Sequence, residues 1–242
     1  MRDDIEQLLR NLKLKGIPEI LDQELERAEQ DGPSFADFLA GLLRYEYHHQ
    51  QARFMKGRID RAKLPERWEL DTFPWQAQPG VRKAAIEQLA ELDFIERATN
   101  IVFIGPTGVG KTGLASALMM RALRAGYRGL FVKAQDLFDE MHRSLADYSS
   151  RKLLDRLIRM DALLIDEMGY LNLRPEQSNI FFKLMEERYS AGRATLITTN
   201  LDYDEWYGFL GDKPMVGALL DRLRHRCHTI RIDGPSLRTP ER

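Results

Sequence analysis

The stretch from Ile101 to Thr112 reads IVFIGPTGVGKT and indicates how most of the chain folds. Its first four residues are apolar, and its last eight fit the pattern G-x-x-x-x-G-K-[ST] at every fixed position. Between a strand and a helix, this pattern forms a loop whose backbone N–H groups surround phosphate oxygens. The residues expected to hold a nucleotide are Gly105, Pro106, Thr107, Gly108, Val109, Gly110, Lys111 and Thr112.

Each residue type in this loop has a chemical reason. Glycines let the backbone approach phosphate without a Cβ clash, and the following helix adds unpaired N–H donors and a favourable dipole. Lys111 can reach the β- and γ-phosphates, and the Thr112 hydroxyl can bind Mg²⁺. A glycine-rich turn that matches by chance is the alternative. The apolar run before the loop and the helical pattern after it favour an ATP and Mg²⁺ site.

Short apolar runs alternate with helical patterns after residue 100, which predicts a parallel sheet covered by helices on both faces. The expected strands are 101–104, 130–132, 162–165, 194–198 and, more weakly, 229–232. The expected fold class is therefore α/β. Helical patterns lie between the strands, at 114–124, 137–145 and 180–189.

Polar side chains end two of these strands. Asp166 and Glu167 follow the apolar run from Ala162 to Ile165, and Asn200 follows the run that starts at Ala194. In a phosphate-loop enzyme, Asp166 would hold the metal and Glu167 would orient or deprotonate the attacking water. Asn200 would hydrogen-bond that water or the γ-phosphate. Solvated turn residues, or an Asn that caps a helix, are the alternatives.

Two arginines near the C-terminus are weaker candidates. Arg222 lies in the basic stretch 219–226, and Arg238 follows Pro235 and Ser236. Either could contact phosphate, and Arg222 could do so in a neighbouring subunit. Composition alone favours solvated basic residues at both positions.

The first hundred residues read as helical. Apolar spacing predicts helices over 5–12 and 17–28, and a third that starts after Ser34 and runs to about Ile59. Asp37 is expected to complete a capping box with Ser34. One face of the third helix is expected to bury Phe35, Phe38, Leu39, Leu42 and Leu43.

The stretch 64–80 reads as an ordered connector because Trp68, Phe73 and Trp75 should be buried, and 81–97 reads as one helix. The expected domains are a helical region 1–67, whose charges are considered next as a DNA-binding surface, a connector 68–99 and an ATPase core 100–242.

The net charge of −1 conceals an uneven distribution. Residues 1–43 hold five basic and ten acidic residues, whereas residues 44–67 hold seven basic and three acidic ones. The second stretch, with Tyr45, Tyr47 and Phe54 interleaved, can neutralise DNA phosphates without reading base sequence. A solvated helix face is the alternative. The candidate DNA contacts are Arg44, Arg53, Lys56, Arg58, Arg61 and Lys63, with Arg67 in the same basic stretch.

The N-terminus does not read as a signal peptide, and no apolar run is long enough to cross a bilayer. We therefore expect a soluble, cytoplasmic protein without a membrane partner.

The motifs together resemble a known family. The loop 105–112, Leu164–Glu167, Thr198–Asn200 and Leu219–Arg222 look like an AAA+ ATPase of the helicase-loader branch. Within this branch, the chain resembles IstB-type helper ATPases of bacterial insertion sequences almost from end to end. The N-terminal and core segments that carry this likeness are Leu12–Ile17, Ser34–Leu43 with Glu46 and Arg53, Ala125–Arg128, and Asp166–Leu171.

The resemblance implies roles for the site residues. Lys111 and Thr112 would be Walker A residues, Asp166 and Glu167 Walker B residues, and Asn200 sensor 1. Arg222 falls at the position of the family's arginine finger. Arg238 falls in a tail motif, with Leu237 in place of its usual aromatic residue, and is a candidate sensor 2. With few residues after Arg222, a separate C-terminal lid is not expected.

The resemblance also implies a function. The chain would bind double-stranded DNA as a homo-oligomer, a ring or spiral, and recruit and stimulate a partner transposase. The nearest alternative is a helicase loader of DNA replication. A small-molecule kinase and a nucleotide-gated scaffold that barely hydrolyses ATP are more distant ones.

Overall fold

The computed structural model describes residues 2–65, 68–169, 171, 173–211 and 213–238, and it divides the chain into two compact units. The units are Met1–Gly57 and Arg58–Arg242. Glu66 and Arg67 of the basic stretch, and Tyr170 of the motif that follows Asp166, lie outside the described residues. Within the described part of the chain, no helix is long and apolar enough to cross a membrane.

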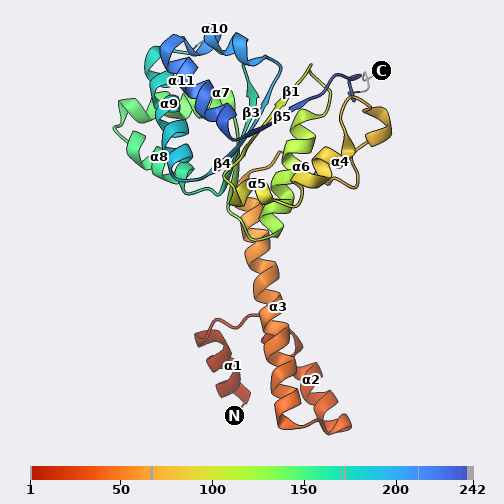
Figure 1. Cartoon of the computed structure of the whole chain (residues 1–242). Helices are drawn as coiled ribbons and strands as arrows, with labels where there is room; N and C mark the ends of the chain where they lie inside the picture. The colour runs from red at the N-terminus through yellow and green to blue at the C-terminus, as the bar shows by residue number, and fades with distance from the viewer. Residues whose placement is uncertain (1, 66–67, 170, 172, 212, 239–242) are drawn as a thin grey trace. The chain divides into compact units, whose positions relative to one another are not determined.

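The first unit contains three helices, which confirms the helical pattern (Figure 1). They are α1 (Arg2–Asn11), α2 (Ile17–Asp31) and α3 (Phe35–Ala62), whose last turns belong to the second unit. Ser34 caps α3, since its Oγ accepts the Asp37 N–H at 3.1 Å and donates to the Asp37 carboxylate at 2.5 Å. The core of this unit is small and consists of Leu9, Ile17, Leu21 and Leu42.

A buried carboxylate joins α3 to the start of α2. Glu46 is 3% exposed, and its side chain accepts the N–H groups of Lys15, Gly16 and Ile17 at 2.6–3.2 Å. The first N–H groups of a helix have no partner inside it, so this carboxylate satisfies them and also complements the helix dipole. Burial raises the pKa of Glu46, but hydrogen bonds from Gln50 and these three amides outweigh it and leave that pKa lowered.

The predicted apolar face of α3 is largely wrong. Phe35 is 96% exposed, Leu39 55% and Leu43 51%, whereas Leu42 is buried and Phe38 is partly buried. The other two helices of the unit contact α3 only along a narrow stripe that contains Phe38 and Leu42. The apolar residues beside this stripe therefore stay in solvent.

The second unit is built on a five-stranded parallel sheet, as the alternating pattern predicted. Its spatial order is β2-β3-β4-β1-β5, so β4 lies between β1 and β3. The strands are β1 (Asn100–Ile104), β2 (Gly129–Lys133), β3 (Ala162–Met168), β4 (Ala194–Thr199) and β5 (Cys227–Arg231). Each expected strand is present, with bounds shifted by a few residues.

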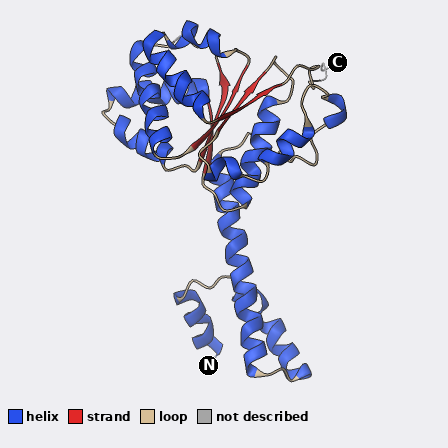
Figure 2. Cartoon of the chain, viewed as in Figure 1, coloured by secondary structure: helices blue, strands red, loops and turns tan. Residues whose placement is uncertain are grey.

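Helices cover both faces of this sheet (Figure 2). Alternate residues of β1 point to opposite layers: Val102 and Ile104 to one, and Ile101 and Phe103 to the other. The first layer contains α7 (Ala134–Ala146), α8 (Ser150–Ile158), α9 (Pro175–Ser190), α10 (Trp206–Leu210) and α11 (Lys213–His225). The second contains α4 (Lys83–Leu89), α5 (Asp93–Glu96), α6 (Lys111–Arg124) and the end of α3.

The connector before the sheet is ordered. Phe73 is buried, and Trp68 and Trp75 pack against the second layer, as expected for large aromatic residues. The single helix predicted over 81–97 is wrong, because α4 ends before Leu92, which has a φ of 69° and breaks the helix. Two short 3-10 turns complete the unit, at Trp75–Ala77 and Tyr203–Glu205.

Candidate functional site

The loop between β1 and α6 has the backbone that its sequence requires. Gly108 and Gly110 have φ values of 88° and 94°, a region that favours glycine. At Gly105, a Cβ would come within 2.4 Å of the Ile232 carbonyl oxygen, so a side chain has no room there. The Lys111 ammonium donates to the carbonyl oxygens of Gly105 and Pro106, at 2.7 Å each, and therefore lies over the loop.

Asp166 lies at the end of β3 beside this loop and is only 2% exposed. Its Oδ1 accepts two hydroxyl groups, Thr112 Oγ1 at 2.8 Å and Thr198 Oγ1 at 2.5 Å. Burial raises the pKa of Asp166, and it does so despite these two hydrogen bonds. A buried carboxylate next to a threonine hydroxyl offers the hard oxygen ligands that Mg²⁺ prefers, so these residues fit the predicted metal.

Among the described residues, no group of three His, Cys, Asp or Glu side chains could hold a metal ion. Protein-bound Mg²⁺ is commonly held by one or two carboxylates together with substrate phosphates and water. Asp166 and Thr112 would therefore hold the ion only together with nucleotide phosphates.

Glu167 differs sharply from its neighbour. Its φ is 58°, an unusual value for a residue other than glycine, and its side chain is exposed in the cleft. The Glu167 N–H donates to Thr198 Oγ1 at 3.0 Å, and its carboxylate lies 3.5 Å from the Lys133 ammonium. Thr198 thus fixes both acids. No role is predicted for Thr198 from the sequence, although its position at the end of a predicted strand is a signal for one.

These groups line one cleft of about 620 Å³. Asn200 lines the cleft because it follows β4, the strand between β1 and β3. Thr199, the last residue of β4, pairs with Ile104 of β1 and with Met168 of β3, so the three strands end at the same edge of the sheet. The cleft brings together the predicted residues Thr107, Gly108, Gly110, Lys111, Thr112, Asp166, Glu167, Asn200 and Arg238.

The connector and the C-terminal tail are both hydrogen-bonded to the loop 105–112. Gln78 is fully buried and its Nε2 donates to the carbonyl oxygens of Val109 and Pro235, at 3.0 Å each. Leu237 N–H donates to the Gly108 carbonyl at 2.9 Å, which carries Arg238 into the cleft. Burial lowers the pKa of Lys111, and the charge of Arg238 lowers it further, while Asp166 and Glu167 oppose this. Gln78 was not anticipated, because it reaches the loop through the fold.

Arg222 lies elsewhere. Its guanidinium is 3.3 Å from Glu186 of α9, and it lines a small cavity of about 110 Å³ between α9 and α11. It is not among the residues of the cleft in its own chain.

The basic stretch falls into two parts. Arg44, Arg53 and Lys56 are exposed on α3 in the first unit. The other predicted contacts, Arg58, Arg61 and Lys63, belong to the second unit, where they line a groove beside β2. The Arg58 Nε donates to the Leu123 carbonyl at 3.1 Å and is only half-exposed.

Comparison with known proteins decides the family. The model of a family described as IstB-like ATP binding protein matches residues 7–242. The chain belongs to this family. A protein of Geobacillus stearothermophilus named for insertion sequence IS5376 and ATP binding is 35% identical over 242 residues, which is 100% of this chain and 96% of that protein. A counterpart of Pseudomonas aeruginosa, named for IS21, is 33% identical over 99% of this chain and 90% of that protein.

Solved structures show the same fold. The crystal structure of DnaI has a TM-score of 0.56 at 22% identity, and the match covers 62% of this chain and 85% of DnaI. The core is thus a P-loop fold of the AAA+ class, and this member of the IstB-like family is an ATPase.

Proposed function

We propose that this ATPase is a DNA-binding regulator of transposition, which assembles on duplex DNA in the cytoplasm and recruits and stimulates a partner transposase. The observation that supports it most is the buried Asp166, hydrogen-bonded to Thr112 beside an intact phosphate loop, in a chain whose relatives are named for insertion sequences. ATP binding would favour the assembly, and hydrolysis would reverse it.

The cleft suggests how ATP is held and cleaved. The loop N–H groups and Lys111 would bind the phosphates. Thr112 and Asp166 would hold Mg²⁺, which would supply positive charge where negative charge develops. Glu167 accepts a proton from the attacking water, because its carboxylate is exposed in the cleft rather than buried as Asp166 is. Asn200 hydrogen-bonds the same water, and Arg238 contacts phosphate from the tail.

The position of Arg222 supports a homo-oligomer, a ring or spiral. An arginine finger must reach the γ-phosphate, and the Arg222 side chain is exposed on α11 outside the cleft of its own chain. It would therefore complete the site of a neighbouring subunit. Glu186 would hold it until the neighbour arrives, because their contact at 3.3 Å is exposed and costs little to break.

Exposed basic side chains on the first unit support the DNA contact. Arg44, Arg53 and Lys56 carry no ion pair to any described residue. Each can neutralise one backbone phosphate, so binding should weaken steeply as salt is raised. Few contacts per subunit mean that firm binding needs many subunits at once.

ATP turnover tests the catalytic part. The rate per subunit should rise with protein concentration and with duplex DNA. Lys111→Ala should abolish it, and Glu167→Gln should stop hydrolysis while trapping large DNA-bound particles. Turnover that needs a small acceptor would indicate a kinase instead, and full function in Glu167→Gln would indicate a scaffold.

Mixing subunits tests the finger. Arg222→Ala alone and Lys111→Ala alone should both be inactive, but a mixture should regain activity, because intact arginines then meet intact loops. Arg82→Ala, at an exposed arginine that lines neither the cavity of Arg222 nor the cleft, is the matched control. Unchanged turnover in Arg222→Ala would contradict the proposed role.

A helicase loader remains the second candidate, because the DnaC helicase loader shares the fold, with a TM-score of 0.54 at 22% identity over 62% of this chain and 88% of DnaC. Pull-downs against an insertion-sequence transposase and against a replicative helicase separate the two. Retention of the helicase alone would overturn the transposition role.

A further inference from the structure

One edge of the sheet is open. β2 is the outermost strand of the described sheet and pairs with β3, from Gly129 opposite Ala162 to Lys133 opposite Asp166. Among the described residues, no other strand bonds to its outer side. Its outward N–H and C=O groups are therefore available to another strand, and an open edge of this kind invites pairing with an added chain.

A groove of about 790 Å³ runs along this edge and includes all five residues of β2. The end of α3 lines one side, and α7 and α8 line the other. Part of its surface is apolar and comes from Leu130, Phe131, Val132, Leu157 and Met160. The groove therefore offers a strand edge and apolar contacts together.

The walls of the groove are strongly basic. Seven arginine or lysine side chains line it, against the two acids Asp136 and Glu140. Arg128 pairs with Asp161, Arg156 with Glu140, and Lys133 with Glu167. In the described part of the chain, Arg61, Lys63 and Arg143 have no acidic partner, and all three are exposed. Their charges are left for a ligand.

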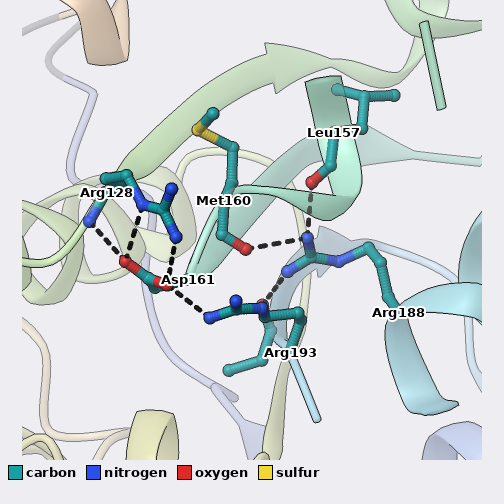
Figure 3. Close-up of polar contacts among 7 residues, drawn as sticks. Arg128, Leu157, Met160, Asp161, Arg188 and Arg193 are labelled. Carbon is teal, nitrogen blue, oxygen red and sulfur yellow. Dashed lines mark hydrogen bonds and ion pairs between the residues drawn. The ribbon is translucent and has the colours of Figure 1, made fainter. Parts of the chain in front are cut away.

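Polar contacts hold the floor of the groove in place (Figure 3). Arg188, fully buried behind it, donates from Nη1 to the carbonyl oxygens of Leu157 and Met160, at 2.7 and 3.1 Å. Asp161 accepts the backbone N–H of Arg128 at 2.9 Å and also pairs with Arg193. The residues that end α8 and precede β2 are held in place, so a ligand would meet a preformed surface.

We propose that the outer edge of β2 binds an extended acidic peptide of a partner protein, which adds a sixth strand to the sheet. Its backbone would pair with β2, alternate apolar side chains would contact Leu130 and Val132, and its acids would meet Arg61, Lys63 and Arg143. A nucleic-acid backbone would use the charges but neither the strand edge nor the apolar floor, so the groove favours a peptide.

The probe is a fluorescein-labelled peptide of eight residues in which Glu and Val alternate, and binding to the full-length chain is followed by anisotropy. We expect saturable binding in the range of about 10–100 µM, typical of a short added strand with charge complementarity. No binding at 1 mM peptide would overturn the proposal, because both the charges and the strand edge would then be unused.

Backbone methylation tests the pairing itself. Two versions of the peptide carry N-methyl groups on alternate amides, in opposite phase. An added strand points every second N–H at β2, so one version should lose binding at least about tenfold and the other should keep it. Equal affinity of the two versions would refute strand addition and leave only charge attraction.

Charge reversal tests the walls. Arg143→Glu should weaken peptide binding about fivefold, whereas Arg82→Glu, exposed on the same unit but outside the groove, should not change it. Thermal unfolding shows whether each variant is folded. If Arg143→Glu is unfolded, Arg143→Gln replaces it as a milder change.

Tighter binding of an eight-nucleotide oligo-dT than of the peptide, with the same loss of binding in Arg143→Glu, would mean that the groove is a nucleic-acid site. If Arg143→Glu changes the particle size of the protein in the absence of peptide, a second copy of this chain occupies the groove and the peptide proposal is wrong.

Discussion

The two units of this ATPase bury their apolar residues to very different degrees. The second unit has two large clusters, one on each face of the sheet, with phenylalanines, leucines and methionines at or near zero exposure. The first unit has a cluster of four, among them Leu9 and Leu42, and leaves Phe35 almost wholly exposed. Three helices can cover only part of one another, whereas a sheet with two helical layers encloses its core.

This difference indicates where each unit obtains its stability. In the second unit, packing dominates, and polar networks such as that of Arg188 organise the ends of strands and helices. In the first unit, a single buried carboxylate, Glu46, holds two helices together and contributes a larger share of that unit's free energy of unfolding. Substitutions that remove one group at a time test this comparison.

Arg188→Met should have the largest effect on stability. Arg188 donates to Thr195 and to the carbonyl oxygens of Leu157, Met160 and Ala194, and its loss leaves buried acceptors without partners. We expect the free energy of unfolding to fall by about 3–5 kcal/mol, measured by urea denaturation. Arg151→Met removes only exposed pairs and should change it by less than about 0.5 kcal/mol. Equal effects would show that the network adds nothing beyond surface charge.

Glu46→Gln should come next and should act on the first unit. The neutral amide is a weaker acceptor for the N–H groups at the start of α2, so we expect a loss of about 1–3 kcal/mol at neutral pH. Because folding lowers the pKa of Glu46, its stabilisation is present above the ordinary pKa of glutamate and disappears as the pH falls through the lowered value. The two chains should therefore converge in acid.

Hydrogen exchange at the Gly16 and Ile17 amides measures this loss directly. Glu29→Gln, an exposed acid on α2, is the control and should leave the exchange rates unchanged. A Glu46→Gln chain whose amides exchange as slowly as those of the wild type would exclude the carboxylate as the tie between the helices.

Asp166→Asn should have a smaller effect of the opposite sign. Burial raises the pKa of Asp166, so the charged form costs stability in the absence of a cation. We expect the nucleotide-free variant to melt a few degrees higher at neutral pH. The folded chain takes up this proton first as the pH falls, which relieves the cost, so the gain should shrink below the raised pKa. Asp136→Asn, at an exposed acid, should show no gain.

Phe35→Ser should have the smallest effect. The side chain is almost fully exposed, so the free energy of unfolding should change by no more than about 0.5 kcal/mol. Leu42→Ala, two turns along the same helix and buried, should cost about 2 kcal/mol or more. A large loss in Phe35→Ser, measured by thermal unfolding, would show that α3 is covered in solution and would reduce the contrast between the units.

The strand positions and most of the cleft could be predicted from the sequence. The loop 105–112 and the tip residues Asp166 and Glu167 are local signals, because each sits next to an apolar run in the chain. The face of α3 could not be predicted, since helical spacing marks Phe35 and Leu42 alike as apolar. Which of them is buried depends on what packs against the helix.

The sequence by itself thus determined the nucleotide loop, the parallel α/β core and the acids at its strand tips, because these depend on residue type and short-range order. The tertiary structure decided the contacts between distant segments. It placed Thr198 between the two acids, Gln78 behind the loop, and the edge of β2 beside the basic end of α3. Such contacts follow from strand order and layer packing, which set the positions of residues far apart in the chain.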